Sequence, residues 1–521
     1  MNAYDRLTAI SEEHAPLIAD LELTELVSQA LDAADLPENF WVGCILNAQT
    51  LDTYKDHDVY HQVGITLMNS GQIELGCEVL RTGFDRNIGD PVADQQYLVT
   101  FMMSPAATKR QLLEAHKEWA RRHEIVPKRP MYWDANRVSR HGKIRVGYVC
   151  HFFGATTMSA VAQLMRDHDH DHFEIFAYDD SAEGAEGART ADHWRKTGGL
   201  TNAEFAKTVC NDGIDILVEI NGMIPGNRYG ALMLRPAPIQ VNWGNYPCTL
   251  GMKCLEFSFA DPITVPAEDR KFYVERIMML DYQSIAMSYE DIDFPVPVEP
   301  PVLKNGYPTF GCFGALHKYN SRVAENWANV LNSIPESRLL IKSAGVEHQM
   351  YRDNIIHLFK NAGVDESMIE IRPPSPYTEM LTEYADIDIV LDTFPMTGGS
   401  TVCESIWSGL PALSVRGNRW SSRQGASILQ SAGLEDFIAE EPAQLVEIAK
   451  SLLDDVESMR DRRLGQRENI SKSAFADRKK TVMQFENIFK QLVEEKRNQG
   501  ETLERLKYTL GRNFGRTLGN R

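Results

Sequence analysis

Apolar residues recur at spacings of three and four over the first 125 positions, with no strand-like alternation, as at Ile18, Leu21 and Val27. This period predicts amphipathic helices. Residues 60–71 and 74–80 have the helix-turn-helix spacing of a tetratricopeptide-like repeat. Because one repeat cannot bury its own apolar face, either degenerate neighbours flank it or its helices pack on the next domain. A plain helical cap is the alternative interpretation.

The period changes near Lys143, where short β-branched runs begin to alternate with amphipathic segments. Strands are predicted at 144–149, 172–178, 214–220, 236–243, 309–314, 338–342, 369–372, 388–391 and 412–415. Helices are predicted at 158–165, 202–209, 323–334, 348–362, 402–408, 443–453 and 475–495. Such alternation indicates an α/β protein with two doubly wound parallel sheets, which leave a cleft between them.

Two proline-rich stretches separate these regions, at 127–130 and 294–301. We therefore predict four parts. They are a helical domain at 1–140, Rossmann-like domains at 141–300 and 301–470, and a closing helix with a basic tail at 471–521. A tail rich in arginine and lysine is typical of a solvated end, and an acidic partner or a membrane surface is the alternative.

A turn of small residues joins the strand that ends at Leu391 to the helix that follows. Gly398 and Gly399 allow close approach of a ligand, and Ser400 and Thr401 can cap the helix. The free N–H groups and the helix dipole favour a phosphate there. Glu404, one turn into the helix, can accept hydrogen bonds from ribose hydroxyls. An ordinary strand-to-helix loop is the alternative.

Composition narrows the classes of function. The chain has 521 residues and a formal net charge of -19, which argues against sequence-independent binding of nucleic acid. Its eight cysteines form no C-x-x-C pair, so neither a zinc ribbon nor a disulfide framework is indicated, and a reducing cytoplasm is expected. Neither a signal peptide nor a membrane span is expected. The chain has neither G-x-G-x-x-G nor a Walker loop, which argues against a dinucleotide oxidoreductase and a P-loop ATPase, and a nucleotide sugar remains a plausible ligand.

One long run carries a specific resemblance. Residues 234–243, followed by Tyr246, Pro247 and the segment 249–251, resemble glycosyltransferase family 41, which contains O-linked N-acetylglucosamine transferase, plant SPINDLY and bacterial protein glycosyltransferases. The resemblance covers about 140–455. Further matching segments are 145–149, 213–218, 221–222, 391–393 and 399–401. The segment 401–405 looks most like the SPINDLY and bacterial branches.

The resemblance implies a GT-B fold and metal-independent, inverting transfer of a sugar to a protein side chain. No cofactor is implied beyond the co-substrate, a UDP-sugar first and a GDP- or CMP-sugar as alternatives. Lys318 matches the family lysine on the donor diphosphate, where a cation offsets charge on the leaving phosphate. By the same resemblance, the expected donor residues are Gly398, Gly399, Ser400, Thr401, Glu404, Lys318 and Pro376. The expected acceptor side of the cleft holds Tyr246, Pro247 and Asn221.

The chain departs from the family at four histidines. Thr156 stands where the N-acetylglucosamine transferases carry a candidate base after the first strand, and nearby His151 has the wrong offset. Asp215 replaces a second histidine and can orient or deprotonate the acceptor, or be a structural aspartate at a strand end. Met380 and Gly399 replace two donor-side histidines, so uracil specificity is not implied. Three explanations of the missing base stay open: Asp215 acts as the base, a donor phosphate oxygen takes the proton, or the donor chemistry is altered.

The expected function is transfer to Ser or Thr of an acceptor protein, with flagellin or an adhesin as the substrate by analogy with bacterial members. Three alternatives are transfer to Asn, a catalytically inactive helical scaffold, and a nucleotide-sugar epimerase of the same architecture. The expected partners are the acceptor protein or peptide and the nucleotide sugar, and no prediction is made for the oligomeric state.

Overall fold

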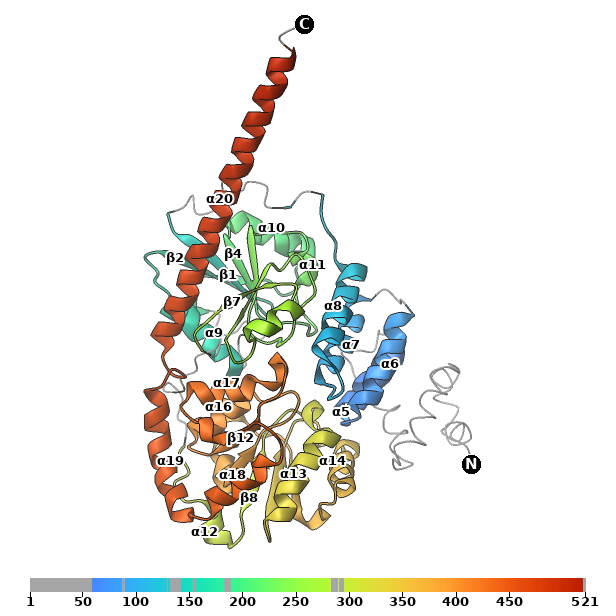
Figure 1. Cartoon of the computed structure of the whole chain (residues 1–521), viewed down its shortest axis with the longest axis vertical. Coiled ribbons are helices and arrows are strands. Elements are labelled where there is room, and N and C mark those ends of the chain that lie inside the picture. The colour runs from blue at the N-terminus through green and yellow to red at the C-terminus, as the bar shows by residue number, and fades with distance from the viewer. Residues whose placement is uncertain are drawn as a thin grey trace. The chain divides into compact units, whose positions relative to one another are not determined.

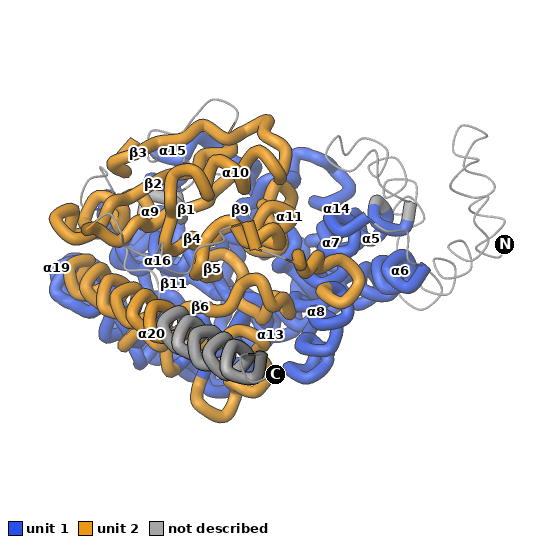
Figure 2. The backbone as a smooth tube through the Cα atoms, turned by 90° about the horizontal axis from the view of Figure 1, so that it is seen from above, with its two compact units in different colours: residues 1–119, 263–265, 287–476 blue, residues 120–262, 266–286, 477–521 orange. Residues whose placement is uncertain are grey.

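The computed structural model describes residues 59–86, 90–128, 130–131, 142–151, 153, 156–181, 189–282, 289 and 295–518. The helices predicted before residue 59 lie outside this part. The chain forms two compact units (Figure 2). Unit 1 comprises residues 1–119, 263–265 and 287–476, and unit 2 comprises residues 120–262, 266–286 and 477–521. The predicted helical domain thus falls with the second predicted Rossmann-like domain, and the closing helix with the first.

Unit 2 contains a parallel seven-stranded sheet of order β3-β2-β1-β4-β5-β6-β7 (Figure 1). Its strands are β1 (Ile144–Cys150), β2 (Phe173–Asp179), β3 (His193–Lys196), β4 (Ile216–Glu219), β5 (Ile239–Asn242), β6 (Phe257–Ala260) and β7 (Arg276–Met279). Its helices are α9 (Thr156–Asp167), α10 (Asn202–Asp212), α11 (Tyr229–Leu232) and α20 (Arg478–Leu518). The four predicted strands are confirmed, whereas β3, β6 and β7 were not predicted.

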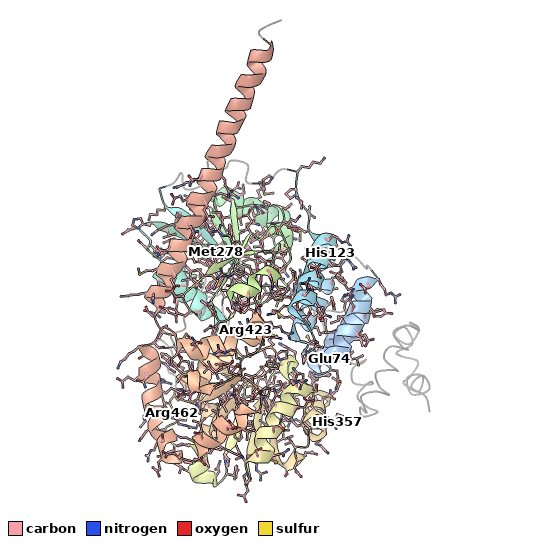
Figure 3. The ribbon with its side chains drawn as sticks, in the orientation of Figure 1. Glu74, His123, Met278, His357, Arg423 and Arg462 are labelled. Atoms are coloured by element: carbon pink, nitrogen blue, oxygen red, sulfur yellow. The ribbon has the colours of Figure 1, made fainter. Side chains whose placement is uncertain are left out.

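Alternate residues of each strand in unit 2 face opposite layers of helix, as the two-residue period of a strand requires. One face packs on α9 and α20, where the ring of Phe485 lies 4.6 Å from that of Phe259 and 4.9 Å from that of Trp243. Met278 of β7 belongs to the same core (Figure 3). α20 begins three residues after the predicted start and continues through the basic tail.

Unit 1 contains a second parallel sheet, of order β10-β9-β8-β11-β12-β13. Its strands are β8 (Thr309–Cys312), β9 (Arg338–Lys342), β10 (Ile369–Arg372), β11 (Ile389–Leu391), β12 (Ala412–Val415) and β13 (Ile438–Ala439). The α-helices between residues 301 and 471 are α12 (Pro301–Asn305), α13 (Ser321–Ser333), α14 (Gln349–Asn361), α15 (Tyr377–Glu383), α16 (Ser400–Trp407), α17 (Gln424–Ser431), α18 (Gln444–Leu453) and α19 (Val456–Ser471). Its 3-10 turns include η5 (Leu316–Lys318) and η8 (Trp420–Ser422). All five predicted strands are confirmed.

The helical segment that precedes the sheets consists of α5 (Val59–Asn69), α6 (Ile73–Asp85), α7 (Pro91–Met103) and α8 (Lys109–His123). Small residues let α5 and α6 approach closely, because a Cβ on Gly64 would lie 2.4 Å from Leu80 and one on Gly76 would lie 3.0 Å from the Gly64 carbonyl oxygen. The predicted helix-turn-helix is confirmed, and its assignment to the tetratricopeptide type stays a prediction. Within the described part of the chain, no helix is both long and apolar enough to cross a membrane.

Candidate functional site

The strand order of unit 1 reverses between β8 and β11. From β8 the chain adds β9 and β10 on one side, and then returns to build β11, β12 and β13 on the other. Parallel sheets bind ligands beyond the carboxyl ends of the strands at such a reversal. Lys318 follows β8 and the Gly398-Gly399 turn follows β11, so the topology brings the two predicted features to one point.

Lys318 contacts the turn directly. Its Nζ donates a hydrogen bond of 3.0 Å to the carbonyl oxygen of Thr397. Burial lowers the pKa of the Lys318 ammonium, while the negative charge of Asp392 acts in the opposite direction. A cation that is partly shielded from water interacts more strongly with a nearby anion than a fully solvated one does.

Asp392 holds the turn in place. Its buried carboxylate accepts hydrogen bonds from the backbone N–H of Gly398 at 2.6 Å, from that of Thr393 at 2.9 Å and from Ser414 Oγ at 2.6 Å. Burial raises the pKa of this carboxyl. Asp392 belongs to a segment that resembles the family, but sequence analysis did not place it in the site. Its signal was an acidic residue directly after a buried strand, and its bonds organise the turn without a ligand.

The two glycines of the turn have different surroundings. A Cβ on Gly398 would lie 2.5 Å from Thr401 Oγ1, whereas a Cβ on Gly399 would meet nothing within 4 Å. Gly399 is the N-cap of α16 and no side chain caps the helix, so the prediction that Ser400 or Thr401 caps it is wrong. Ser400 and Thr401 are its first two helical residues, whose N–H groups have no acceptor within the helix. Open space at such a helix start suits a phosphate.

Glu404 is buried beneath the start of α16. Its Oε1 accepts a hydrogen bond from Tyr377 Oη at 3.2 Å, and its Oε2 accepts one from Tyr384 Oη at 3.3 Å. Burial raises the pKa of Glu404 to about 7. Pro376 is the N-cap of α15 and directly precedes Tyr377. Pro376 is therefore connected to Glu404 through Tyr377. Contact of Pro376 or Glu404 with a ribose or a base stays a prediction.

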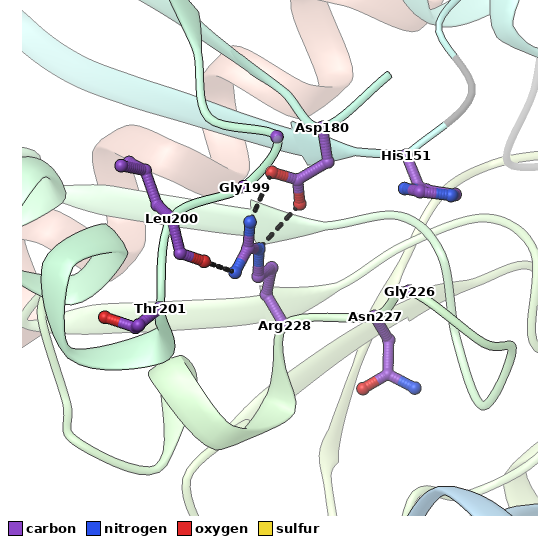
Figure 4. A pocket seen from close by; sticks show the side chains of 9 residues that line it. His151, Asp180, Gly199, Leu200, Thr201, Gly226, Asn227 and Arg228 are labelled. Atoms are coloured by element: carbon purple, nitrogen blue, oxygen red, sulfur yellow. Dashed lines mark hydrogen bonds and ion pairs between the residues drawn. The ribbon is translucent and has the colours of Figure 1, made fainter. Parts of the chain in front are cut away.

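Unit 2 has its own reversal of strand order, between β1 and β4. A pocket of about 380 Å³ opens at the carboxyl ends of its strands (Figure 4). The residues that line it are His151, Asp180, Gly198, Gly199, Leu200, Thr201, Gly226, Asn227 and Arg228. Arg228 forms a bidentate pair with Asp180, at 2.7 and 2.8 Å, and donates to the Leu200 carbonyl oxygen at 2.7 Å. These bonds fix one wall of the pocket.

Asn221, a predicted acceptor-side residue, joins the loops that follow β1 and β4. Its Oδ1 accepts from the His151 backbone N–H at 2.8 Å. Its own backbone N–H and its Nδ2 both donate to Glu219 Oε1 at 3.0 Å, and the N–H of Gly222 donates to Glu219 Oε2 at 3.1 Å. Burial raises the pKa of Glu219 to about 7. Sequence analysis missed Glu219, an acid at the last position of an otherwise apolar strand.

Tyr246 and Pro247 do not line the pocket. Both are buried, and a Cβ on Gly222 would lie 2.5 Å from the Tyr246 Cβ. Their packing shapes the loop after β4, and a contact with the acceptor stays a prediction.

Asp215 lies away from the other predicted residues of unit 2. It directly precedes β4, and its Oδ2 accepts from the Arg145 backbone N–H at 2.9 Å. The pocket lies at the carboxyl ends of the strands, so the four residues of β4, about 3.3 Å each, separate the two places. This position favours the structural alternative over the predicted role with the acceptor. Thr156 begins α9, and its predicted role stays a prediction.

No group of three or more His, Cys, Asp or Glu side chains in the described ranges is arranged to hold a metal ion. Lys318 stays the predicted cation of the site. Its Nζ is bonded to Thr397, three residues before the first helical residue of α16.

Comparison with known proteins gives one consistent relationship. The model of Glycosyl transferase family 41 matches residues 105–286 and 303–485. The chain is 28% identical over 411 residues to the probable UDP-N-acetylglucosamine–peptide N-acetylglucosaminyltransferase SPINDLY of Solanum lycopersicum, across 77% of this chain and 44% of that protein. It is 25% identical over 314 residues to the probable enzyme SEC of Arabidopsis thaliana, across 57% of this chain and 32% of that protein.

A solved structure agrees with this relationship. A mutant of the Thermobaculum terrenum O-GlcNAc transferase matches with a TM-score of 0.76 and 23% identity, across 96% of this chain and 99% of that one. The chain spans less than half the length of the curated relatives that it matches. The family match extends over both sheets and exceeds half of the chain. This chain therefore has the GT-B fold and belongs to glycosyl transferase family 41.

Proposed function

We propose that the chain is a protein glycosyltransferase that moves a sugar from a nucleotide-sugar donor, a UDP-sugar first, to Ser or Thr of an acceptor protein. One observation carries the proposal, the hydrogen bond of Lys318 to the turn that opens α16, at the reversal of strand order in unit 1. A cation and unpaired helix N–H groups at one place suit a diphosphate. The names of the plant relatives, which specify UDP-N-acetylglucosamine and a peptide, support the donor and acceptor classes.

In the proposed reaction, the acceptor hydroxyl oxygen forms a bond to the anomeric carbon from the face opposite the nucleotide. The bond from that carbon to the diphosphate oxygen breaks, its electron pair stays on the diphosphate, and the configuration inverts. Negative charge on the leaving oxygen grows in the transition state, so Lys318 and the N–H groups of α16 stabilise that state more than the bound donor. No metal is needed for this charge compensation.

The hydroxyl proton needs an acceptor. Asp215 lies at the amino end of β4 and is bonded to the Arg145 backbone, which argues against it as the base. We assign the proton to a phosphate oxygen of the donor, the alternative that requires no side chain from the substituted histidine positions. Under this assignment, Thr156 supports the acceptor without titrating.

Transfer to Asn is the second candidate acceptor chemistry, and an inactive scaffold is the alternative of another class. The retained contacts around the turn, from Lys318 and Asp392, argue against an inactive scaffold. The proposed setting is the cytoplasm, and flagellin or an adhesin is the proposed acceptor of a bacterial family member.

Intact-mass analysis tests the proposal. Candidate acceptors are incubated with the chain and a panel of UDP-, GDP- and CMP-sugars, and the modified residue is mapped by fragmentation. We expect a mass increase of one sugar with one donor class, at Ser or Thr, and its loss with Lys318→Met. Modification at Asn would replace the Ser/Thr proposal. Donor turnover without any acceptor product would indicate an epimerase, and no reaction with any pair would support the scaffold.

A further inference from the structure

Arg419 is a buried arginine, and sequence analysis assigned it no role. It is 5% exposed and lies directly before η8 in unit 1. Its Nη2 donates to the carbonyl oxygens of Ser104 at 2.7 Å and Met102 at 3.1 Å, and its Nη1 donates to that of Ala107. These carbonyls end α7 or follow it. The last carbonyl groups of a helix accept no hydrogen bond from within it, so a cation at that end stabilises the helix.

On its other side, the Arg419 segment contacts the turn that precedes α16, the candidate phosphate site. Arg419 Nε donates to Ser421 Oγ at 3.3 Å. The Ser421 carbonyl oxygen accepts from the Thr397 N–H at 3.0 Å and from Thr397 Oγ1 at 3.1 Å. The Thr397 carbonyl oxygen in turn accepts from Lys318 Nζ at 3.0 Å. A continuous set of hydrogen bonds therefore leads from the end of α7 to the ammonium of the candidate donor site.

Two packing contacts join the same parts independently. Met396 of the turn packs against a cluster formed by the helical segment, whose members are Ile65, Met68, Ile73, Cys77 and Met103. Gly71, at the end of α5, lies so close to η5 that a Cβ there would be 2.6 Å from the Tyr319 carbonyl oxygen. Both segments that carry the site, the turn and the η5 region, thus rest on the helices.

Neighbouring bonds hold the Arg419 segment itself. Arg423, which is labelled in Figure 3, donates from its Nε to the Gly417 carbonyl oxygen at 2.9 Å. The Gly425 N–H donates to Thr397 Oγ1 at 3.0 Å. The loop between β12 and α17 is therefore fixed at both ends, and its position determines where Thr397 lies.

We propose that Arg419 is a positioning residue for the donor site, and that the helical segment α5–α8 acts through it to hold the Thr397 turn in the geometry that binds a nucleoside diphosphate. The proposal rests on the proposed function for its ligand. Arg419 does not itself touch the donor. Loss of its three carbonyl contacts would let the turn move and separate Lys318 from the N–H groups of α16.

The test compares Arg419→Met with Arg463→Met in the full chain. Arg463 is a matched control, because it is also buried in unit 1 and donates to carbonyl oxygens, those of Pro297 at 3.0 Å and Ile387 at 2.7 Å. Ile387 lies before β11, at the strand end opposite to the turn. Both variants should lower the Tm.

Two readouts separate positioning from stability. Hydrogen exchange of the peptide 396–402 should become at least about five times faster in Arg419→Met and stay unchanged in Arg463→Met, since local opening is specific to the contacts removed. The Kd for UDP should rise by about fivefold or more in Arg419→Met alone. Arg419→Lys should recover part of both effects, because an ammonium reaches one or two of the carbonyls but lacks the guanidinium fork.

Equal exchange of the peptide 396–402 in the two Met variants would overturn the inference. It would also be overturned if Arg419→Lys recovered neither the exchange rate nor the Kd relative to Arg419→Met. A wild-type chain that binds no nucleoside diphosphate would overturn the proposed function, while the exchange measurement would still decide the role of Arg419.

Discussion

Replacing Lys318 with Met removes one positive charge from the candidate diphosphate site and keeps an unbranched apolar stem. The ammonium is anchored at 3.0 Å to the Thr397 carbonyl oxygen, so its position next to the start of α16 is defined. At about 4 Å from a phosphate oxygen and an effective dielectric constant of about 20, one pair of charges contributes about 4 kcal/mol at most. Mutational data for hydrogen bonds to charged groups give about 1.5–3 kcal/mol.

A loss of about 2 kcal/mol corresponds to a rise of about 30-fold in the Kd for UDP. The loss in kcat/KM should be greater, because charge on the leaving oxygen grows in the transition state. Titration calorimetry with UDP at two salt concentrations measures the first effect, and initial rates measure the second. The affinity of Lys318→Met should also depend less on salt, since one ionic contact is gone.

The control for Lys318→Met is Lys360→Met, which changes the net charge equally. Lys360 lies on α14 in an exposed ion pair with Glu366 at 3.2 Å, so its loss should leave UDP binding unchanged. Asp392 keeps its three hydrogen-bond donors in Lys318→Met, so the Tm should fall by only a few degrees. If UDP bound equally well to Lys318→Met and wild type, the assignment of the diphosphate site would be refuted.

Three further predictions address other parts of the two sites. Burial raises the pKa of Glu404 to about 7, above its value in the unfolded chain, so the stability of the wild type should fall as the pH rises from about 4.5 to 7. Glu404→Gln should remove this fall, as measured by denaturant unfolding at several pH values. Gly399→Ala should leave the Tm nearly unchanged but weaken UDP binding, whereas Gly398→Ala should lower both the Tm and the affinity for UDP, because only the Cβ at 398 would overlap protein atoms. Equal Tm values for the two variants in thermal unfolding would contradict this difference. Arg228→Met should destabilise the fold by about 3 kcal/mol, because it leaves the buried Asp180 carboxylate without its bidentate partner, and Arg228→Met with Asp180→Asn should recover part of that loss in unfolding experiments.

The period of apolar residues determined the element types. Alternation of β-branched runs with amphipathic segments predicted two parallel sheets, and all nine predicted strands are present in them. Two of the missed strands escaped detection for different reasons: β3 consists of His, Trp, Arg and Lys without a β-branched residue, and the two residues of β13 are too few to establish a period. The turn at residues 398–401 was also evident locally, because small residues between a strand and a helix suit a phosphate, although an ordinary loop was the alternative.

Pairing between distant segments was decided only by the tertiary structure. Lys318 and Gly399 are 81 positions apart in the sequence, and only the strand order of unit 1 brings them together. Asp215 directly precedes one short strand and Glu219 ends it, so the direction of that strand places Glu219 at the carboxyl edge of the sheet and Asp215 at the opposite edge. A sequence pattern shows which residues face a core, but the edge of a sheet at which a side chain lies depends on where its strand begins and ends.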